Sequence, residues 1–266
     1  MRGTPKLFKE PAPDHKRWGL ALLCVAGLLL FCNTGSYAQA AANRGPAAAS
    51  NISATARFGE AQALLKQGNF KGALGEVQEG LRLEPRSVMG LNLLGIILSH
   101  EGKQSEALDA LKSALRVEPN STDTHNNLGD FYLEKGKPDL AENEFRITLR
   151  LDPRNRDANY NLGSILLFRH DARHAIEALQ RVQPADPATL FRLTQAYFAA
   201  HENAKARSAA QALSAREPHD VKVHFSLGVL LASAGQFQPA VHELELADAL
   251  RPGTFEILHN LGGAYL

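Results

Sequence analysis

The 266-residue sequence has only two cysteines, Cys24 and Cys32, and both lie in one apolar run near the N-terminus. If that run is removed, the remaining chain has no disulfide, no thiol nucleophile and no cysteine-ligated metal. Aromatic residues make up 7% of the chain. Because the chain is rich in Ala and Leu and has no run of alternating β-branched residues, we expect α-helices. Lys and Arg total 29 against 28 Asp and Glu, so a nucleic-acid surface, which needs clustered positive charge, is not expected.

Catalytic signatures are also missing. The sequence has no G-x-S-x-G, P-loop, H-E-x-x-H or C-x-x-C motif, so we expect a non-enzymatic protein without a cofactor. His170 and His174 have the i, i+4 spacing of two metal ligands on a helix. No third ligand lies nearby, so we place His170 in a turn and His174 at an exposed helix start, and we expect no metal.

The N-terminus has the three parts of a secretory signal peptide. Residues 1–17 carry five Lys and Arg against two Asp and Glu, residues 18–32 are apolar, and an A-x-A exit ends at Ala40. We therefore expect a signal peptide over 1–40, export across the inner membrane of a bacterium, and a periplasmic or secreted product. The alternative is an uncleaved anchor that keeps the protein at the membrane, although 15 apolar residues fall short of the about 20 that usually span a bilayer.

After cleavage the chain would carry 24 Lys and Arg against 26 Asp and Glu, which is slightly acidic. Residues 41–53 are small and polar, so we expect a flexible linker there.

From residue 54 onward two independent columns repeat with steps of 34, 34, 31, 34 and 34 residues. The small-residue column is Gly95, Gly129, Gly163, Thr194, Gly228 and Gly262. The proline column is Pro85, Pro119, Pro153, Pro184, Pro218 and Pro252. The same single irregular step in both columns indicates stacked copies of one supersecondary unit.

Each column has a separate physical role. A small residue lets two helices approach closely, because a larger side chain would hold their axes apart. A turn glycine, found at Gly68, Gly102, Gly136 and Gly235, suits the positive φ of a helix C-cap. The closing proline stops the second helix because it cannot donate to the helical hydrogen bonds.

The pattern resembles the tetratricopeptide repeat, a 34-residue helix–turn–helix with Leu-Gly, a large residue three positions later, an alanine and a terminal proline. The resemblance covers residues 54–266 and implies an all-α fold, a right-handed superhelical solenoid. Six complete units are expected to begin near Ala54, Val88, Thr122, Arg156, Pro187 and Val221.

Two irregularities stand out. The fourth unit is three residues short, so its second helix should lose most of a turn and the superhelix should be irregular between units four and five. A seventh unit begins near Thr254, and the sequence ends halfway into its first helix, which suggests a truncated product.

The resemblance also implies a concave surface lined by the first helices of the units. Two adjacent positions in each first helix, together with Asp130, which directly follows Gly129, are candidates for a peptide-binding groove. The candidate residues are Asn92, Asn126, Asn127, Asp130, Tyr160, Asn161, Phe191, Arg192, Phe225 and Asn260. An Asn carboxamide both donates and accepts, so it suits capture of an extended backbone, and three successive aromatics would form an apolar shelf. The alternatives are that the Asn side chains bond a neighbouring unit and that the aromatics pack in the core.

Some members of this family clamp an acidic C-terminal tail with Lys, Arg and Asn. Asn161 and Arg192 match two of those positions, but Asp130 would repel a carboxylate. We therefore do not expect that clamp.

The leading hypothesis is an exported, non-catalytic scaffold that binds a protein or peptide in an elongated groove, with no nucleic-acid partner. The step from fold to function rests on the family resemblance. The alternative is the N-terminal targeting or regulatory arm of a larger enzyme, such as a peptidase or glycosyltransferase, whose catalytic domain lies beyond residue 266. The membrane becomes a partner only if residues 18–32 remain as an anchor.

Overall fold

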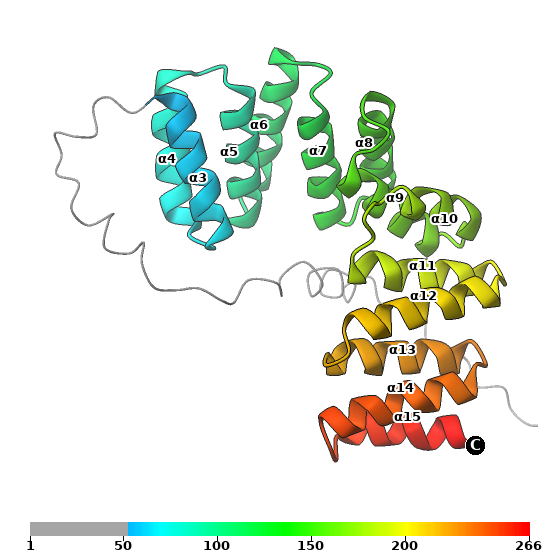
Figure 1. Cartoon of the computed structure of the whole chain (residues 1–266). Coiled ribbons are helices and arrows are strands. Elements are labelled where there is room, and N and C mark those ends of the chain that lie inside the picture. Colours follow the sequence, from blue (N-terminus) through cyan, green and yellow to red (C-terminus); the bar gives the residue numbers. More distant parts are fainter. Residues whose placement is uncertain (1–52) are drawn as a thin grey trace, which may run out of the picture.

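A computed structural model describes residues 53–266, so the expected signal peptide and nearly all of the expected linker lie outside the described residues. The described part folds into thirteen helices and contains no strand (Figure 1). The helices are α3 (Ala54–Lys66), α4 (Phe70–Leu83), α5 (Val88–His100), α6 (Gln104–Val117), α7 (Thr122–Glu134), α8 (Pro138–Leu151), α9 (Arg156–Phe168), α10 (Ala172–Gln180), α11 (Pro187–Ala199), α12 (Asn203–Arg216), α13 (Val221–Ser233), α14 (Phe237–Leu250) and α15 (Phe255–Tyr265). Consecutive helices pair as α3–α4, α5–α6 and so on, which confirms the predicted all-α solenoid of helix–turn–helix units.

The turn glycines predicted from the sequence and the helix-capping residues lie at the ends of the helices, in the conformations that turns and caps need. The turn glycines have positive φ, as at Gly68 (72°) and Gly102 (77°). In units four and five, His170 (61°) and His201 (59°) take the same left-handed conformation without being glycine. Most first helices begin with a side-chain cap, such as Ser87 for α5 and Asn155 for α9.

The small-residue column allows the two helices of each unit to pack closely. A Cβ on Gly129 would lie 2.4 Å from the Phe145 ring, and one on Gly228 would lie 2.5 Å from Leu244. Thr194 replaces the glycine in unit five. The residue that faces it, 16 positions later, is Ala210, whereas the glycines of the other complete units face Leu or Phe at the same spacing. The two positions therefore vary in size in opposite directions, so that the buried volume is conserved.

A second pair of positions links the two helices of some units through polar groups. The two members are 19 residues apart in each case: Arg57 with Glu76, His125 with Glu144, and His224 with Glu243. The closest N···O distances are 2.9, 2.7 and 2.7 Å. The units with Leu at the first position have Ala at the second, so the polar pair and the apolar pair are alternative solutions to one packing site.

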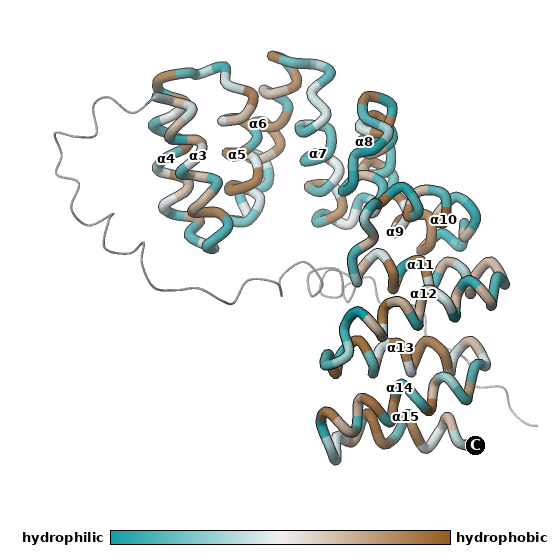
Figure 2. The backbone as a smooth tube through the Cα atoms, in the orientation of Figure 1, coloured by the Kyte–Doolittle hydropathy of each residue, from teal (hydrophilic) through white to brown (hydrophobic). Residues whose placement is uncertain are grey.

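The hydrophobic core runs between the helices along the whole array. One buried cluster extends from Ala141 and Phe145 in unit three to Ala206 and Ala209 in unit five. Figure 2 shows α5 and α13 as largely hydrophobic, as expected for inner helices with neighbours on several sides.

The fourth unit changes the direction of the array. Helix α10 has 9 residues where the other complete second helices have 14, so it is shortened as the short repeat predicted, but by more than one turn rather than by most of a turn. Arginines from both sides hold the segment at 181–186 that follows: Arg156 donates to Pro184 O and to Asp186, both at 2.6 Å, and Arg216 donates to Ala185 O at 2.7 Å. In Figure 1 the helices from α11 onward lie crosswise to α3–α8.

Candidate functional site: the face of the first helices

Most first helices of successive units are in contact with one another: α3 with α5, α5 with α7, α7 with α9, α9 with α11, and α13 with α15, whereas α11 and α13 make little contact. Within residues 53–266 no two second helices make comparable contact. In a curved array the elements on the inner side lie closer together, so the first helices form the inner face. The candidate groove residues all belong to these helices.

Three of the candidates form one hydrogen-bonded cluster on α7 and α9. Asn161 Nδ2 donates to Asp130 Oδ1 at 2.7 Å, and Asn126 Nδ2 donates to Asp130 Oδ2 at 3.3 Å. Asn126 is 9% exposed, and its Oδ1 is buried without a hydrogen-bond partner. Asn92 occupies the equivalent position on α5, is 7% exposed, and also has a buried Oδ1 without a partner.

Asp130 has an unusual electrostatic environment. Burial is the largest influence and the negative charges of Asp157 and Glu134 add to it, and together they raise the pKa of Asp130 to about 7. The two carboxamides that donate to Asp130 are neutral. The carboxyl group therefore titrates near neutral pH in the middle of the inner face.

The remaining polar candidates do not join this cluster. Asn127 is half-buried on α7. Arg192 Nη1 on α11 donates to Gln195 Oε1 at 3.0 Å, and Asn260 Nδ2 donates to the backbone of its own helix at Glu256 O, at 2.7 Å. The carboxamides thus do not form a continuous ladder, because each meets a different neighbour.

The three aromatic candidates are partly buried. Tyr160 packs against the cluster that joins units three to five, while Phe191 and Phe225 pack against the cluster of units five to seven. Each ring therefore contributes to the packing between units and still presents part of its surface to solvent.

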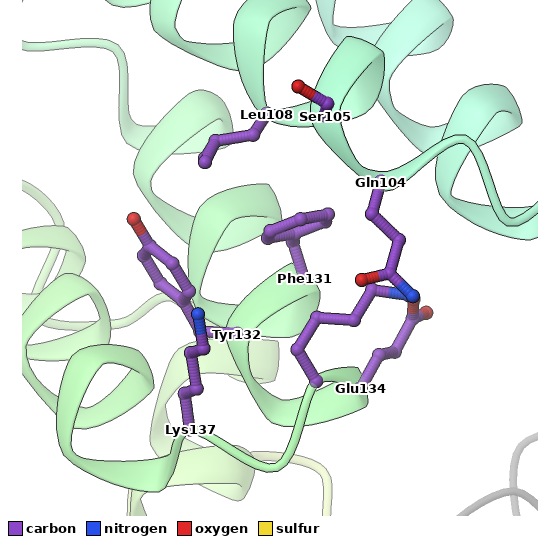
Figure 3. Close-up of a pocket in the computed structure, with 8 residues that line it drawn as sticks. Gln104, Ser105, Leu108, Phe131, Tyr132, Glu134 and Lys137 are labelled. Atoms are coloured by element: carbon purple, nitrogen blue, oxygen red, sulfur yellow. The ribbon is translucent and has the colours of Figure 1, made fainter.

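A separate hollow of about 540 Å³ lies where the start of α6 meets the end of α7 (Figure 3). Leu108 and Phe131 form its apolar floor, and Lys135 Nζ lies 5.5 Å from the centroid of the Phe131 ring. Its rim mixes Lys137 with Glu134, so it has no single charge preference. Sequence reasoning missed this hollow, because it depends on the gap between two units rather than on any repeat position.

The histidine pair takes the places expected of it. His170 lies in the turn before α10, and His174 is exposed in the first turn of α10 with its Nδ1 2.8 Å from Asp171. Within residues 53–266 no three His, Cys, Asp or Glu side chains are placed to hold a metal. No helix in this part of the chain is long and apolar enough to cross a membrane.

The model of the tetratricopeptide repeat matches residues 58–124, 126–189 and 191–253. The chain belongs to the tetratricopeptide repeat family. This result agrees with the small-residue column, the turn glycines and the closing prolines, all of which take their expected structural positions in this tetratricopeptide repeat array.

Solved structures resemble the array in fold. PilW, described as a widely conserved type IV pilus biogenesis factor, is 20% identical, with a TM-score of 0.67 over 78% of this chain and 98% of its own. PilF of Pseudomonas aeruginosa is 19% identical, with a TM-score of 0.65 over 77% and 95%. YrrB, described as a TPR protein with an unusual peptide-binding site, is 20% identical, with a TM-score of 0.58 over 69% and 96%. No curated protein matches the sequence.

Proposed function

We propose that the protein is an exported, non-catalytic scaffold that binds an extended segment of a partner protein along the inner face of its repeat array. The observation that carries the proposal is the row of half-buried polar and aromatic side chains on successive first helices, from Asn127 on α7 to Phe225 on α13. Each of these side chains is held in place by its buried part and presents its exposed part to a partner segment. The described peptide-binding site of YrrB gives a precedent within this fold.

The array supports this function through its length. Units stacked about 10 Å apart, as packed helices are, present similar positions at regular intervals. An extended chain offers backbone donors and acceptors at regular intervals too, so several weak contacts can add along one segment. Tetratricopeptide repeats are in general modules for binding proteins, and the sequence contains no catalytic motif that would indicate an additional reaction.

A peptide selection tests the groove. A phage-displayed library of random dodecapeptides is selected on the full chain, and the enriched peptides are measured by fluorescence polarisation. The groove variant combines Asn127→Ala with Arg192→Ala, and the control variant combines Asn143→Ala with Arg150→Ala, two exposed residues of the outer helix α8. Loss of two interface side chains should weaken binding by about tenfold or more, whereas the control variant should bind like the unmodified chain.

The unfolding midpoint decides how a loss of binding is interpreted. If the groove variant binds as tightly as the control, or if no peptide is enriched, the inner face is not the binding surface. If the unfolding midpoint of the groove variant falls together with its affinity for the peptide, the two side chains stabilise the fold rather than bind the partner. Asn161 is left unchanged because its carboxamide is already bonded to Asp130.

The proposed location has its own test. PilW is described as a type IV pilus biogenesis factor, which supports an envelope location for this protein. Mass spectrometry of the protein from its host should find a new N-terminus near residue 41. An intact Met1 would instead support retention of residues 18–32 as a membrane anchor.

A further inference from the structure

The cluster around Asp130 has more hydrogen-bond acceptors than donors. Each Asp130 oxygen receives one carboxamide N–H and can accept at least one more hydrogen bond. Asn126 Oδ1, on the residue that donates to Asp130, is buried without a donor. A buried acceptor without a donor is costly, so the cluster as it stands is short of hydrogen-bond donors.

Within residues 53–266, the charges that act most strongly on Asp130 are negative. Asp157 and Glu134 act on Asp130, and both are acidic. Glu134 is bonded to a neutral group, Ser99 Oγ, at 2.7 Å. An acceptor-rich, negatively charged place on an inner face fits a ligand group that is positively charged and rich in N–H donors.

We propose that this cluster is the recognition site for an arginine side chain of the partner segment. A guanidinium is planar and has five N–H donors in a fixed arrangement, so it can donate two parallel hydrogen bonds to the Asp130 carboxylate, each of whose oxygens can accept one more. Lysine offers its charge at a single point and matches this arrangement less well. The inference rests on the groove function proposed above and specifies the chemistry of the partner at α7 and α9.

The test compares two small peptides that differ only in charge. The full chain is labelled with ¹⁵N-asparagine and titrated at pH 8 with acetyl-Ala-Arg-Ala-amide, and separately with the same peptide containing citrulline. Citrulline keeps the shape of arginine and lacks its charge. The arginine peptide should cause saturable shifts of the Asn126 and Asn161 side-chain amide signals. The citrulline peptide should bind at least about tenfold more weakly.

Two variants with the same change in net charge complete the design. Asp130→Asn keeps an oxygen that can accept from Asn161 and should weaken binding of the arginine peptide by about tenfold. Asp109→Asn removes an exposed carboxylate from the outer helix α6 and should leave binding unchanged. If Asp130→Asn fails to fold, the comparison of the two peptides on the unmodified chain decides the question.

Three results would overturn the inference. The two peptides could shift the Asn126 and Asn161 signals with equal affinity, the shifts could fall only on asparagines outside the inner face, or Asp109→Asn could weaken binding as much as Asp130→Asn. The groove function can survive all three, because its test uses selected peptides and the variants at Asn127 and Arg192. Selected peptides that bind the groove but contain no basic residue would refute the arginine site alone.

Discussion

Replacement of Asp130 by asparagine should stabilise the protein in a way that depends on pH. The pKa of Asp130 is about 7 in the fold against 3.8 for an ordinary aspartate. Between these values the folded state holds a proton that the unfolded state has lost, so the free energy of unfolding falls as pH rises from about 4 to about 7. Above pH 7 the full cost of ionising the half-buried carboxyl is present, and the neutral asparagine avoids it.

The magnitude follows from the size of the shift. About three pKa units at about 1.4 kcal/mol each give an upper bound of about 4 kcal/mol. Water reaches a half-buried carboxylate and its neighbours relax around the charge, so about 1–3 kcal/mol is expected. The hydrogen bond from Asn161 remains available to the new carboxamide oxygen, and only the longer bond from Asn126, at 3.3 Å, is lost.

Urea unfolding followed by circular dichroism at pH 5 and pH 8 measures the effect. Asp130→Asn should exceed the unmodified chain in unfolding free energy by about 1–3 kcal/mol at pH 8, and the difference should be markedly smaller at pH 5. Asp109→Asn, on an exposed outer position, should change stability by less than about 0.5 kcal/mol at both values. A variant that is less stable at pH 8, or a gain of equal size at both pH values, would refute the electrostatic reasoning.

Two further predictions concern the repeat itself. Gly228→Ala should lower the unfolding free energy by about 1–3 kcal/mol, because the new Cβ would lie 2.5 Å from Leu244. Adding Leu244→Val recreates the pair of Ala61 and Val77 in unit one. In a double-mutant cycle this second change should recover part of the loss. Simple additivity of the two changes would show that the positions do not compensate each other. His201→Gly should raise the unfolding free energy by about 0.5–1 kcal/mol because a non-glycine residue at φ 59° is strained, whereas His219→Gly, at an exposed position, serves as the control. A loss of stability at His201 in thermal unfolding would show that its side chain makes a contact that outweighs the strain.

Much of the fold could be predicted because it depends on periodic steric rules. A small residue at Gly129, a turn glycine at Gly136 and a proline at Pro153 each permit one local conformation or one close approach, and the spacing repeats that requirement. The shortening of the fourth unit was predicted from the same spacing, because residues missing from a repeat have to be missing from one of its helices or turns, and here the helix is α10. The paired positions 19 residues apart were not predicted, although His125 and His224 have the same place in their units.

The chemistry of the inner face could be predicted only in part. Periodicity indicates which helix face a residue occupies, but the partner of a polar side chain depends on its rotamer and on the neighbouring unit. Asn161 and Asn260 share one column, yet Asn161 bonds Asp130 of the preceding unit and Asn260 bonds its own helix. The influence of Asp157 on Asp130 joins two different columns, so no single repeat position reveals it.

The crosswise turn at the fourth unit limits the shape of any long ligand. Three units span roughly 30 Å, which a strand-like chain covers with about nine residues at about 3.3 Å each. A straight peptide of that length can follow the helices before α10, but a longer one must bend where the inner face bends. The arginines that hold the segment at 181–186 therefore fix the angle between the inner faces on its two sides, and with it the bend that the proposed partner segment would have to follow.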